Sequence, residues 1–247
     1  MPYEERLRCI KEAGFDEVIL SWEDEIEPRL IPKEDMVGMA RDAGLEVTNF
    51  HAPYRGYNDI WEKDAAGSRY FLDELCGFVE DCAHFDVPAI VVHTCDRELN
   101  DFNFENGLRF FETLGKFGQD KGVDIAVENV SRQDLLYKLL DEIQLPHFGI
   151  CYDSSHDHMK PEWHGKILDR YGKRIKALHI SDNDFKEDRH WIPGEGKIDF
   201  ETLIPRLIGF GQDTIAFEVQ ANQEWRKKTP QAFCGAVRRS LDFLKLD

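Results

Sequence analysis

The stretch QDKGVDIAVENV, residues 119–130, decides the fold. It begins with the polar end of a helical pattern, passes through Gly122, and continues as a short apolar run that closes on Glu128. A glycine at this place supplies the left-handed turn that ends a helix and directs the chain into a strand. The nearly continuous apolar run is typical of a strand buried on both faces of a parallel sheet. The stretch therefore predicts one helix-to-strand unit of an α/β protein.

This unit repeats along the chain. Helical patterns such as residues 32–44 and 104–122 alternate with short apolar runs. Repeated right-handed crossovers build either an open doubly wound sheet or a closed barrel. The 247 residues are normal for one α/β barrel, and no linker or composition break divides them. We expect a (β/α)8-type TIM barrel in a single domain over residues 1–247, with strands at residues 16–22, 45–53, 88–95, 124–130, 147–156, 175–182 and 213–219.

The pattern contains seven strands, whereas a complete barrel has eight. The chain opens directly in a helical pattern, so the first strand is either missing or replaced by Pro2 and Tyr3. A missing strand would leave a gap beside the strand that carries Glu218. The N-terminus or the partner subunit of a homodimer would then have to cover that gap.

The composition restricts the partners and the compartment. The net charge of -17 repels polyanions, which disfavours a nucleic-acid partner and suits a protein that acts on small molecules. No apolar run is long enough to span a bilayer, and the charged N-terminus lacks the apolar core of a signal peptide. The six cysteines form no C-x-x-C pair, so we expect free thiols and a cytoplasmic protein.

Polar residues follow the apolar runs at equivalent places. The carboxyl ends of all strands of a parallel barrel open on one face, where the chemistry of such enzymes occurs. From the second run onward these ends carry His51, His93, Glu128, Asp153, His156, His179 and Glu218, and the stretch DRHWIPGEGKIDF adds Asp188 and His190. A charged residue in an apolar strand is costly unless it is paired or binds a metal.

Each of these residues has an ordinary structural explanation when taken alone. A single histidine at a strand end is commonly a packing residue, and the sequence Asp-Arg-His occurs in surface loops. As a set, however, imidazole and carboxylate groups suit zinc, manganese, cobalt or iron. Asp188 and His190 lie two residues apart, so they point to the same side if the chain is extended. The remaining histidines are interpreted as structural or surface residues: His84, His147, His158 and His164.

The chain resembles the xylose-isomerase-like barrel superfamily from about Glu4 to the C-terminal helix. The motifs that carry the resemblance are HAPY, VENV, CYDSSH, LHISDND, GEGKIDF and FEV. No one of these motifs is specific, but their order and spacing are typical of the superfamily. It includes sugar and sugar-phosphate isomerases and epimerases, and apurinic endonucleases of the endonuclease IV type.

The resemblance to the epimerase branch implies a divalent metal held by Glu128, Asp153, His179 and Glu218. It also implies that His156 contacts substrate oxygens. The resemblance to the endonuclease branch implies up to three zinc ions, with His51, His93, Asp188 and His190 as further ligands beside these five residues. Asn129, Ser155 and Asp182 are candidates for orienting the ligands.

Three functions follow as hypotheses. The first is an isomerase or epimerase of a small sugar or sugar phosphate that uses one to three divalent ions, zinc or manganese. Glu128 and Glu218 would exchange a proton with the carbon next to the carbonyl through an enediolate. Trp22 and Trp191 would form apolar walls for the sugar, although each also suits core or rim packing. The alternatives are a zinc-cluster phosphoesterase of the endonuclease IV type and a non-catalytic metal-binding barrel.

Overall fold

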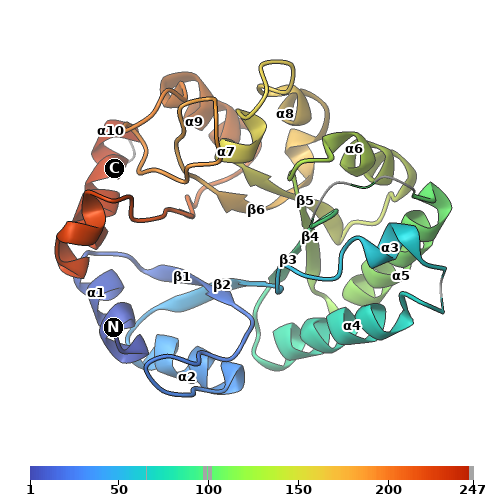
Figure 1. Cartoon of the computed structure of the whole chain (residues 1–247), viewed down its shortest axis with the longest axis horizontal. Helices are drawn as coiled ribbons and strands as arrows, with labels where there is room; N and C mark the ends of the chain where they lie inside the picture. Colours follow the sequence, from blue (N-terminus) through green and yellow to red (C-terminus); the bar gives the residue numbers. More distant parts are fainter. Residues whose placement is uncertain (65, 97–98, 100–101, 245–247) are drawn as a thin grey trace. The chain divides into compact units, whose positions relative to one another are not determined.

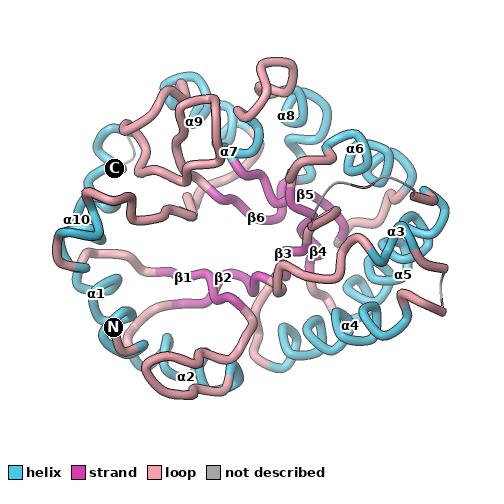
Figure 2. Tube along the Cα trace, viewed as in Figure 1, coloured by secondary structure: helices cyan, strands magenta, loops and turns pink. Residues whose placement is uncertain are grey.

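The computed structural model describes residues 1–64, 66–96, 99 and 102–244. Helices and strands alternate along this part of the chain (Figures 1 and 2). The strands are β1 (Glu17–Ser21), β2 (Glu46–His51), β3 (Ala89–Val92), β4 (Asp124–Glu128), β5 (Phe148–Asp153) and β6 (Ile175–His179). The α-helices are α1 (Tyr3–Glu12), α2 (Lys33–Asp42), α3 (Asp59–Glu62), α4 (Arg69–His84), α5 (Phe104–Lys121), α6 (Gln133–Glu142), α7 (Ser154–Asp157), α8 (Lys166–Tyr171), α9 (Phe200–Gly209) and α10 (Pro230–Leu244). Two short 3-10 helices are η1 (Gly172–Arg174) and η2 (Trp225–Lys227).

The strands form a sheet in the order in which they occur in the chain, β1-β2-β3-β4-β5-β6. The pairs β2 with β3, β3 with β4, and β4 with β5 are parallel. This order of parallel strands joined by helical crossovers is that of a (β/α)8-type barrel, as the sequence predicts. In the register of β4 and β5, Glu128 lies opposite Cys151.

The chain forms two compact units. Unit 1 contains residues 1–47, 153–173 and 178–247, and unit 2 contains residues 48–152 and 174–177. The single domain expected over residues 1–247 stays a prediction, and the two units are described separately below.

The helices of unit 2 pack on its strands because small residues allow a close approach. Helix α5 contacts β4, and a side chain at Gly118 would overlap Ile125 and the carbonyl of Val123. Helix α5 ends at Gly122, whose φ of 71° is the left-handed turn that the sequence predicts. The strand residues Ile125 and Val127 are fully buried, and each such side chain contributes about 1.5–3 kcal/mol. Close contacts between helix and sheet therefore hold the strands of unit 2 in place.

Unit 1 packs its outer helices against one another, with α1 in contact with both α2 and α10. Gly14, with a φ of 95°, follows α1, and Gly44, with a φ of 80°, follows α2, so both helices end in the same left-handed turn as α5. None of the helices in the described ranges combines the length and apolar character needed to cross a membrane.

The seventh strand, expected at residues 213–219, is not formed. Residues 210–229, all of them described, contain no strand and appear as loop between α9 and α10 except at η2 (Figure 2). Only one isolated bridge joins Ile180 to Phe217. Beyond this bridge the backbone of Asp182 pairs instead with Trp191, through two N–H···O bonds of 2.8 Å. The chain after β6 therefore has no free backbone groups at Asp182 with which to extend a ladder along residues 213–219.

Candidate functional site

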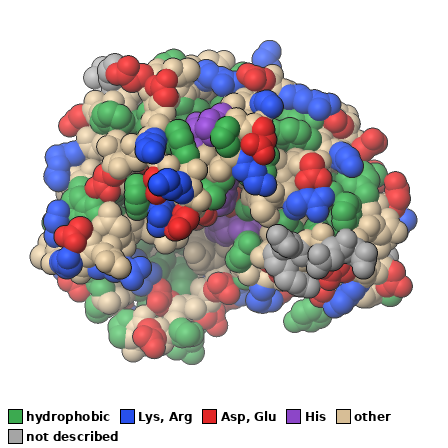
Figure 3. All heavy atoms as spheres, turned by 45° about the horizontal axis from the view of Figure 1, so that its top comes forward, with side chains coloured by type: hydrophobic (Ala, Val, Ile, Leu, Met, Phe, Trp, Pro, Cys, Tyr) green, Lys and Arg blue, Asp and Glu red, His purple; other side chains and the backbone are tan. Residues whose placement is uncertain are grey.

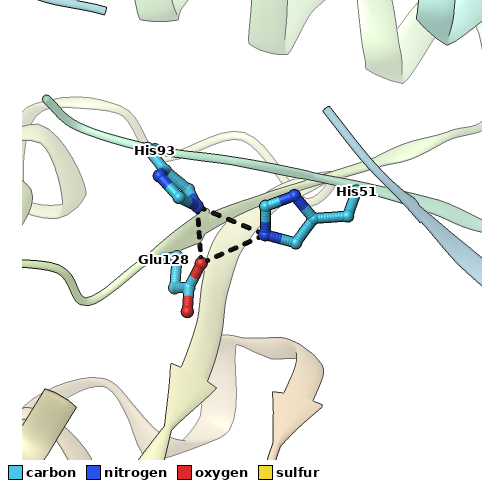
Figure 4. Close-up of side chains that lie close together, drawn as sticks. All are labelled: His51, His93 and Glu128. Carbon is cyan, nitrogen blue, oxygen red and sulfur yellow. Dashed lines mark hydrogen bonds and ion pairs between the residues drawn. The ribbon is translucent and has the colours of Figure 1, made fainter. Parts of the chain in front are cut away.

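Unit 2 brings three of the predicted ligands together at the ends of β2, β3 and β4 (Figure 4). His93 Nε2 lies 2.8 Å from Glu128 Oε2, and His51 Nε2 lies 3.4 Å from the same oxygen. The two imidazole nitrogens are 3.2 Å apart. Three ligand atoms of the types that divalent metals prefer thus converge within one small group.

The orientation of His51 is favourable for metal binding. Its Nδ1 lies 2.9 Å from the carbonyl oxygen of Ala52, which can only accept a hydrogen bond. A hydrogen bond from Nδ1 to this carbonyl fixes the ring so that Nε2 faces Glu128 and is the nitrogen that a metal would bind. His93 is held by Tyr57, whose ring stacks on the imidazole at 5.5 Å between centroids, and by Tyr54 at 4.6 Å. Tyr54 is the last residue of the HAPY motif, whereas Tyr57 lies outside the motifs quoted above.

Unit 1 contains the other six predicted ligands. Asp153 ends β5 and caps the short helix α7, because its Oδ1 accepts a 2.7 Å hydrogen bond from the backbone N–H of His156. This immediate turn into a helix leaves His156 Nδ1 3.7 Å from Asp153 Oδ1. His179, at the end of β6, has its Nδ1 3.0 Å from Glu218 Oε2. Asp153, His179 and Glu218 offer ligand atoms within 4.8 Å of one another.

The second group of unit 1 is built around Asp188. Its Oδ2 lies 3.0 Å from His156 Nε2 and 3.1 Å from His190 Nε2, and its Oδ1 accepts a 2.8 Å hydrogen bond from Ser155 Oγ. His190 has a φ of 46°, so Asp188 and His190 do not meet through the extended chain that was expected. A left-handed turn at the histidine brings the two side chains together instead.

These contacts shift two pKa values in unit 1. Burial alone would raise the pKa of Asp188, but hydrogen bonds from His156 and His190 lower it well below its usual range. Burial alone would lower the pKa of His190, whereas Asp188, Asp153 and Glu218 together raise it to about 9. His190 is therefore held as an imidazolium in the absence of a competing cation, and a metal would have to displace its proton.

The loop that carries Asp188 and His190 is organised by Asp182, a buried residue that is 1% exposed. Its Oδ1 accepts three backbone N–H bonds and its Oδ2 accepts two, all between 2.8 and 3.0 Å. The donors are Asn183, Lys197 and Ile198 for Oδ1, and Gly194 and Gly196 for Oδ2. Side chains cannot be added freely here, because a Cβ at Gly196 would overlap Asp182 Oδ1 and the carbonyl oxygen of Asn183.

The donor sets fit a divalent metal. Ligands that lie about 2.0–2.2 Å from a tetrahedral zinc ion are about 3.3–3.6 Å from one another. The separations of 2.8 to 3.4 Å among His51, His93 and Glu128 are close to this range. The separations of 3.0 and 3.1 Å around Asp188 also approach it. Small outward movements of these side chains would admit an ion.

The two tryptophans predicted as sugar walls differ in position. Trp22 is 1% exposed and packs as a core residue, so it has little surface to offer a substrate. Trp191 directly follows His190 and is partly exposed, with the guanidinium of Arg189 5.5 Å from its ring centroid. The other four histidines have local contacts, of which the 2.8 Å contact of His147 Nδ1 with Asp124 Oδ1 is an example.

Comparisons with known proteins identify the family and the fold. The family model described as "Xylose isomerase-like TIM barrel" matches residues 7–244. Two solved structures that are similar to this chain are those of an L-ribulose 3-epimerase and of the IOLI protein with a binding zinc atom. The first has a TM-score of 0.77 and 15% identity and covers 98% of this chain and 88% of the epimerase. The second has a TM-score of 0.75 and 19% identity and covers 98% of this chain and 92% of IOLI.

A curated relative is similar over part of the sequence. Fructoselysine 3-epimerase of Escherichia coli O157:H7 is 26% identical over 109 residues. This alignment covers 40% of this chain and 39% of the epimerase.

Proposed function

Because the chain belongs to the xylose isomerase-like TIM-barrel family, we propose that it is a divalent-metal-dependent isomerase or epimerase of a small sugar or sugar phosphate. The observation that carries the proposal is that each unit pairs a carboxylate with an imidazole that lies at or directly after the end of a strand. Glu128 lies 2.8 Å from His93 in unit 2, and Glu218 lies 3.0 Å from His179 in unit 1. Such carboxylates serve as metal ligands and as proton acceptors. The names of the epimerases that resemble this chain support the same class of reaction.

We assign metal ligation to Asp153, His179 and Glu218 in unit 1 and to Glu128 in unit 2, as the sequence resemblance implies. When bound, a divalent ion polarises the substrate carbonyl and its neighbouring hydroxyl. Of Glu128 and Glu218, one carboxylate abstracts the proton next to the carbonyl, and the other, in its protonated form, donates a proton to the enediolate. We assign His156 Nε2 to hold a substrate hydroxyl. In the structure this nitrogen lies 3.0 Å from Asp188 Oδ2.

The two glutamates differ in access to water. The Glu218 side chain is 38% exposed, whereas that of Glu128 is 1% exposed. A proton taken by Glu218 exchanges readily with solvent, and one taken by Glu128 is protected from it. Deuterium in the product comes from the donating glutamate, so rapid uptake within one turnover in heavy water indicates that Glu218 is the donor and Glu128 the base.

The test combines metal analysis with this exchange. Protein purified without chelator is analysed for metals, then assayed in heavy water with L-ribulose, fructose and fructoselysine as probes. On a confirmed substrate, Glu128→Gln and Glu218→Gln should each slow C–H exchange by at least about a hundredfold. The control is Glu112→Gln on α5, where the exposed carboxylate pairs only with Lys116 among its described ion pairs. If both glutamine variants exchange as fast as the parent, the proposal is wrong.

A zinc-cluster phosphoesterase is the second candidate function. It is favoured by the additional donors in the groups His51, His93, Glu128 and His156, Asp188, His190, which exceed what one ion needs. The net charge of -17 repels a long polyanionic substrate and so disfavours a nucleic acid. On the face shown in Figure 3, acidic and basic side chains are intermixed around exposed histidines. A content of about three zinc ions per chain and chelator-sensitive cleavage of an abasic-site duplex would favour this candidate, whereas a single ion would favour the isomerase.

A further inference from the structure

A hollow of about 380 Å³ in unit 1 lies outside the groups described above. Its volume falls at the lower end of the range of small-molecule sites, about 300–1,000 Å³, and suits a single ring. Its walls come from the loop that follows His190 and from the segment around η2. We call it the tryptophan pocket, and its lining residues are Trp191, Glu195, Asn222, Glu224, Trp225 and Lys228.

Hydrogen bonds hold the polar groups of the tryptophan pocket in place. Trp225 Nε1 donates to Glu195 Oε1 at 2.7 Å, and Asn222 Nδ2 donates to Glu195 Oε2 at 3.5 Å. The side-chain oxygen of Asn222 also accepts the backbone N–H groups of Glu224 and Trp225, each at 3.0 Å. The carboxylate and the indole are thus oriented before any ligand binds, which lowers the entropic cost of binding.

The chemistry of the lining favours a neutral hydroxylated ring. Indole faces pack on apolar C–H surfaces, and the Glu195 carboxylate keeps lone pairs that accept hydroxyl hydrogens. The Nζ of Lys228 lies 3.8 Å from the Trp225 ring centroid, and an ammonium group at this place is a potential donor to a hydroxyl oxygen. An anionic group such as a phosphate would meet Glu195 and Glu224, and the latter already pairs with Lys227 at 2.5 Å. This combination of aromatic faces with a fixed carboxylate matches a sugar ring better than a phosphate.

The tryptophan pocket is connected directly to the candidate metal ligands of unit 1. The backbone N–H of Gln220 donates a 2.7 Å bond to the carbonyl of His190, and His190 Nδ1 lies 3.1 Å from the carbonyl of Glu218. Trp191 is the next residue after His190, so its Cα lies about 3.8 Å from that of the histidine. Trp191 therefore places one wall of the tryptophan pocket beside the backbone of His190.

We propose that the tryptophan pocket binds a neutral sugar ring. In the proposed isomerase, this ring is the non-reacting part of a glycoside substrate. This second part of the proposal rests on the proposed function. The first step concerns binding alone, so it can be tested without metal and without activity.

The experiment uses chelator-treated full-length protein and three probes: methyl β-D-glucopyranoside, cellobiose and glucose 6-phosphate. Binding is followed by tryptophan fluorescence and by saturation-transfer NMR. The two neutral sugars should bind more tightly than the phosphate, and Trp225→Ala should weaken them at least about tenfold. The matched control is Trp163→Ala, because Trp163 is a partly exposed tryptophan that also carries a lysine, Lys160, 4.5 Å from its ring centroid.

Three results would overturn the proposal: no binding of either neutral sugar up to about 50 mM, tighter binding of the phosphate, or equal losses in the two alanine variants. Glu195→Gln, which keeps the shape of the side chain, gives a second measurement if Trp225→Ala does not fold. It should also weaken sugar binding, and unchanged binding would contradict the pocket. If the protein binds the neutral sugars but has no isomerase activity, only the link to a glycoside substrate is contradicted. If it has isomerase activity but does not bind these sugars, sugar binding in the tryptophan pocket is contradicted.

Discussion

Replacement of Asp182 by asparagine tests how the loop that carries Asp188 and His190 is held. Asparagine has nearly the same shape, but one of its two side-chain oxygens is replaced by an NH2 group. If the amide nitrogen takes the place of Oδ2, it faces the N–H groups of Gly194 and Gly196, which now donate to that oxygen at 3.0 and 2.8 Å. If it takes the place of Oδ1, three N–H groups lose their acceptor. Either orientation loses at least two hydrogen bonds.

The expected loss of stability follows from these bonds. A hydrogen bond to a charged group contributes about 1.5–3 kcal/mol, so two of them contribute about 3–6 kcal/mol. For a chain of this size, 1 kcal/mol corresponds to a shift in Tm of about 2–4 °C. We therefore expect Asp182→Asn to lower the Tm by about 6–24 °C, or to release residues 183–198 locally if that segment opens before the whole protein unfolds.

Thermal unfolding followed by circular dichroism measures the first effect, and hydrogen exchange of peptides from residues 183–198 measures the second. Asp16→Asn is the control, because the Asp16 side chain is 89% exposed and its substitution should change the Tm by no more than about 2 °C. A Tm shift for Asp182→Asn no larger than that of this control, together with unchanged exchange of the segment, would refute this role of Asp182.

Three further predictions concern the same region and its metals. Gly196→Ala should lower the free energy of unfolding by about 1–3 kcal/mol, because the added Cβ overlaps Asp182 Oδ1 and the carbonyl oxygen of Asn183. A urea unfolding curve equal to that of the parent would contradict this prediction. In chelator-treated protein the raised pKa of His190, about 9, contributes stability that is complete below the unfolded value near 6.5 and is lost as pH rises through 9. Because its partner Asp188 is 38% exposed, we expect a loss on the order of 1–2 kcal/mol between pH 6 and pH 10, and His190→Gln should remove this dependence. Removal of bound metal with dipicolinate should lower the Tm by about 5–10 °C, because an ion present at a hundredfold excess over its Kd stabilises the protein by a corresponding amount. Addition of zinc or manganese should restore the Tm. An unchanged Tm in protein shown to lose metal would contradict ligation by the candidate metal ligands.

The strand-end residues could be predicted because their position depends on local sequence. Apolar runs that follow a helix-ending glycine form parallel strands, and parallel strands place their carboxyl ends at one edge of the sheet. His51, His93 and Glu128 therefore meet at the ends of β2, β3 and β4. Asp153 and His156 meet because the turn into α7 follows the strand at once.

Other features depend on competition between distant segments, and local sequence does not record its outcome. Residues 213–219 have the composition of a strand, but the backbone of Asp182 pairs with Trp191 instead, so only one bridge forms at Phe217. Tyr57 stacks on His93 although 36 residues separate them, and no local pattern marks that contact.

The sequence by itself determined the alternation of helices and strands and the meeting of His51, His93 and Glu128 at neighbouring strand ends, because both follow from the periodicity of the apolar runs. Only the tertiary structure decided that Asp182 organises the loop of Asp188 and His190, through N–H groups up to 16 residues away. It likewise decided that Trp225 meets Glu195, 30 residues distant in the chain, to form the tryptophan pocket. The physical reason is that a buried carboxylate or indole takes whichever partners packing brings within hydrogen-bond distance, and packing is a property of the whole unit.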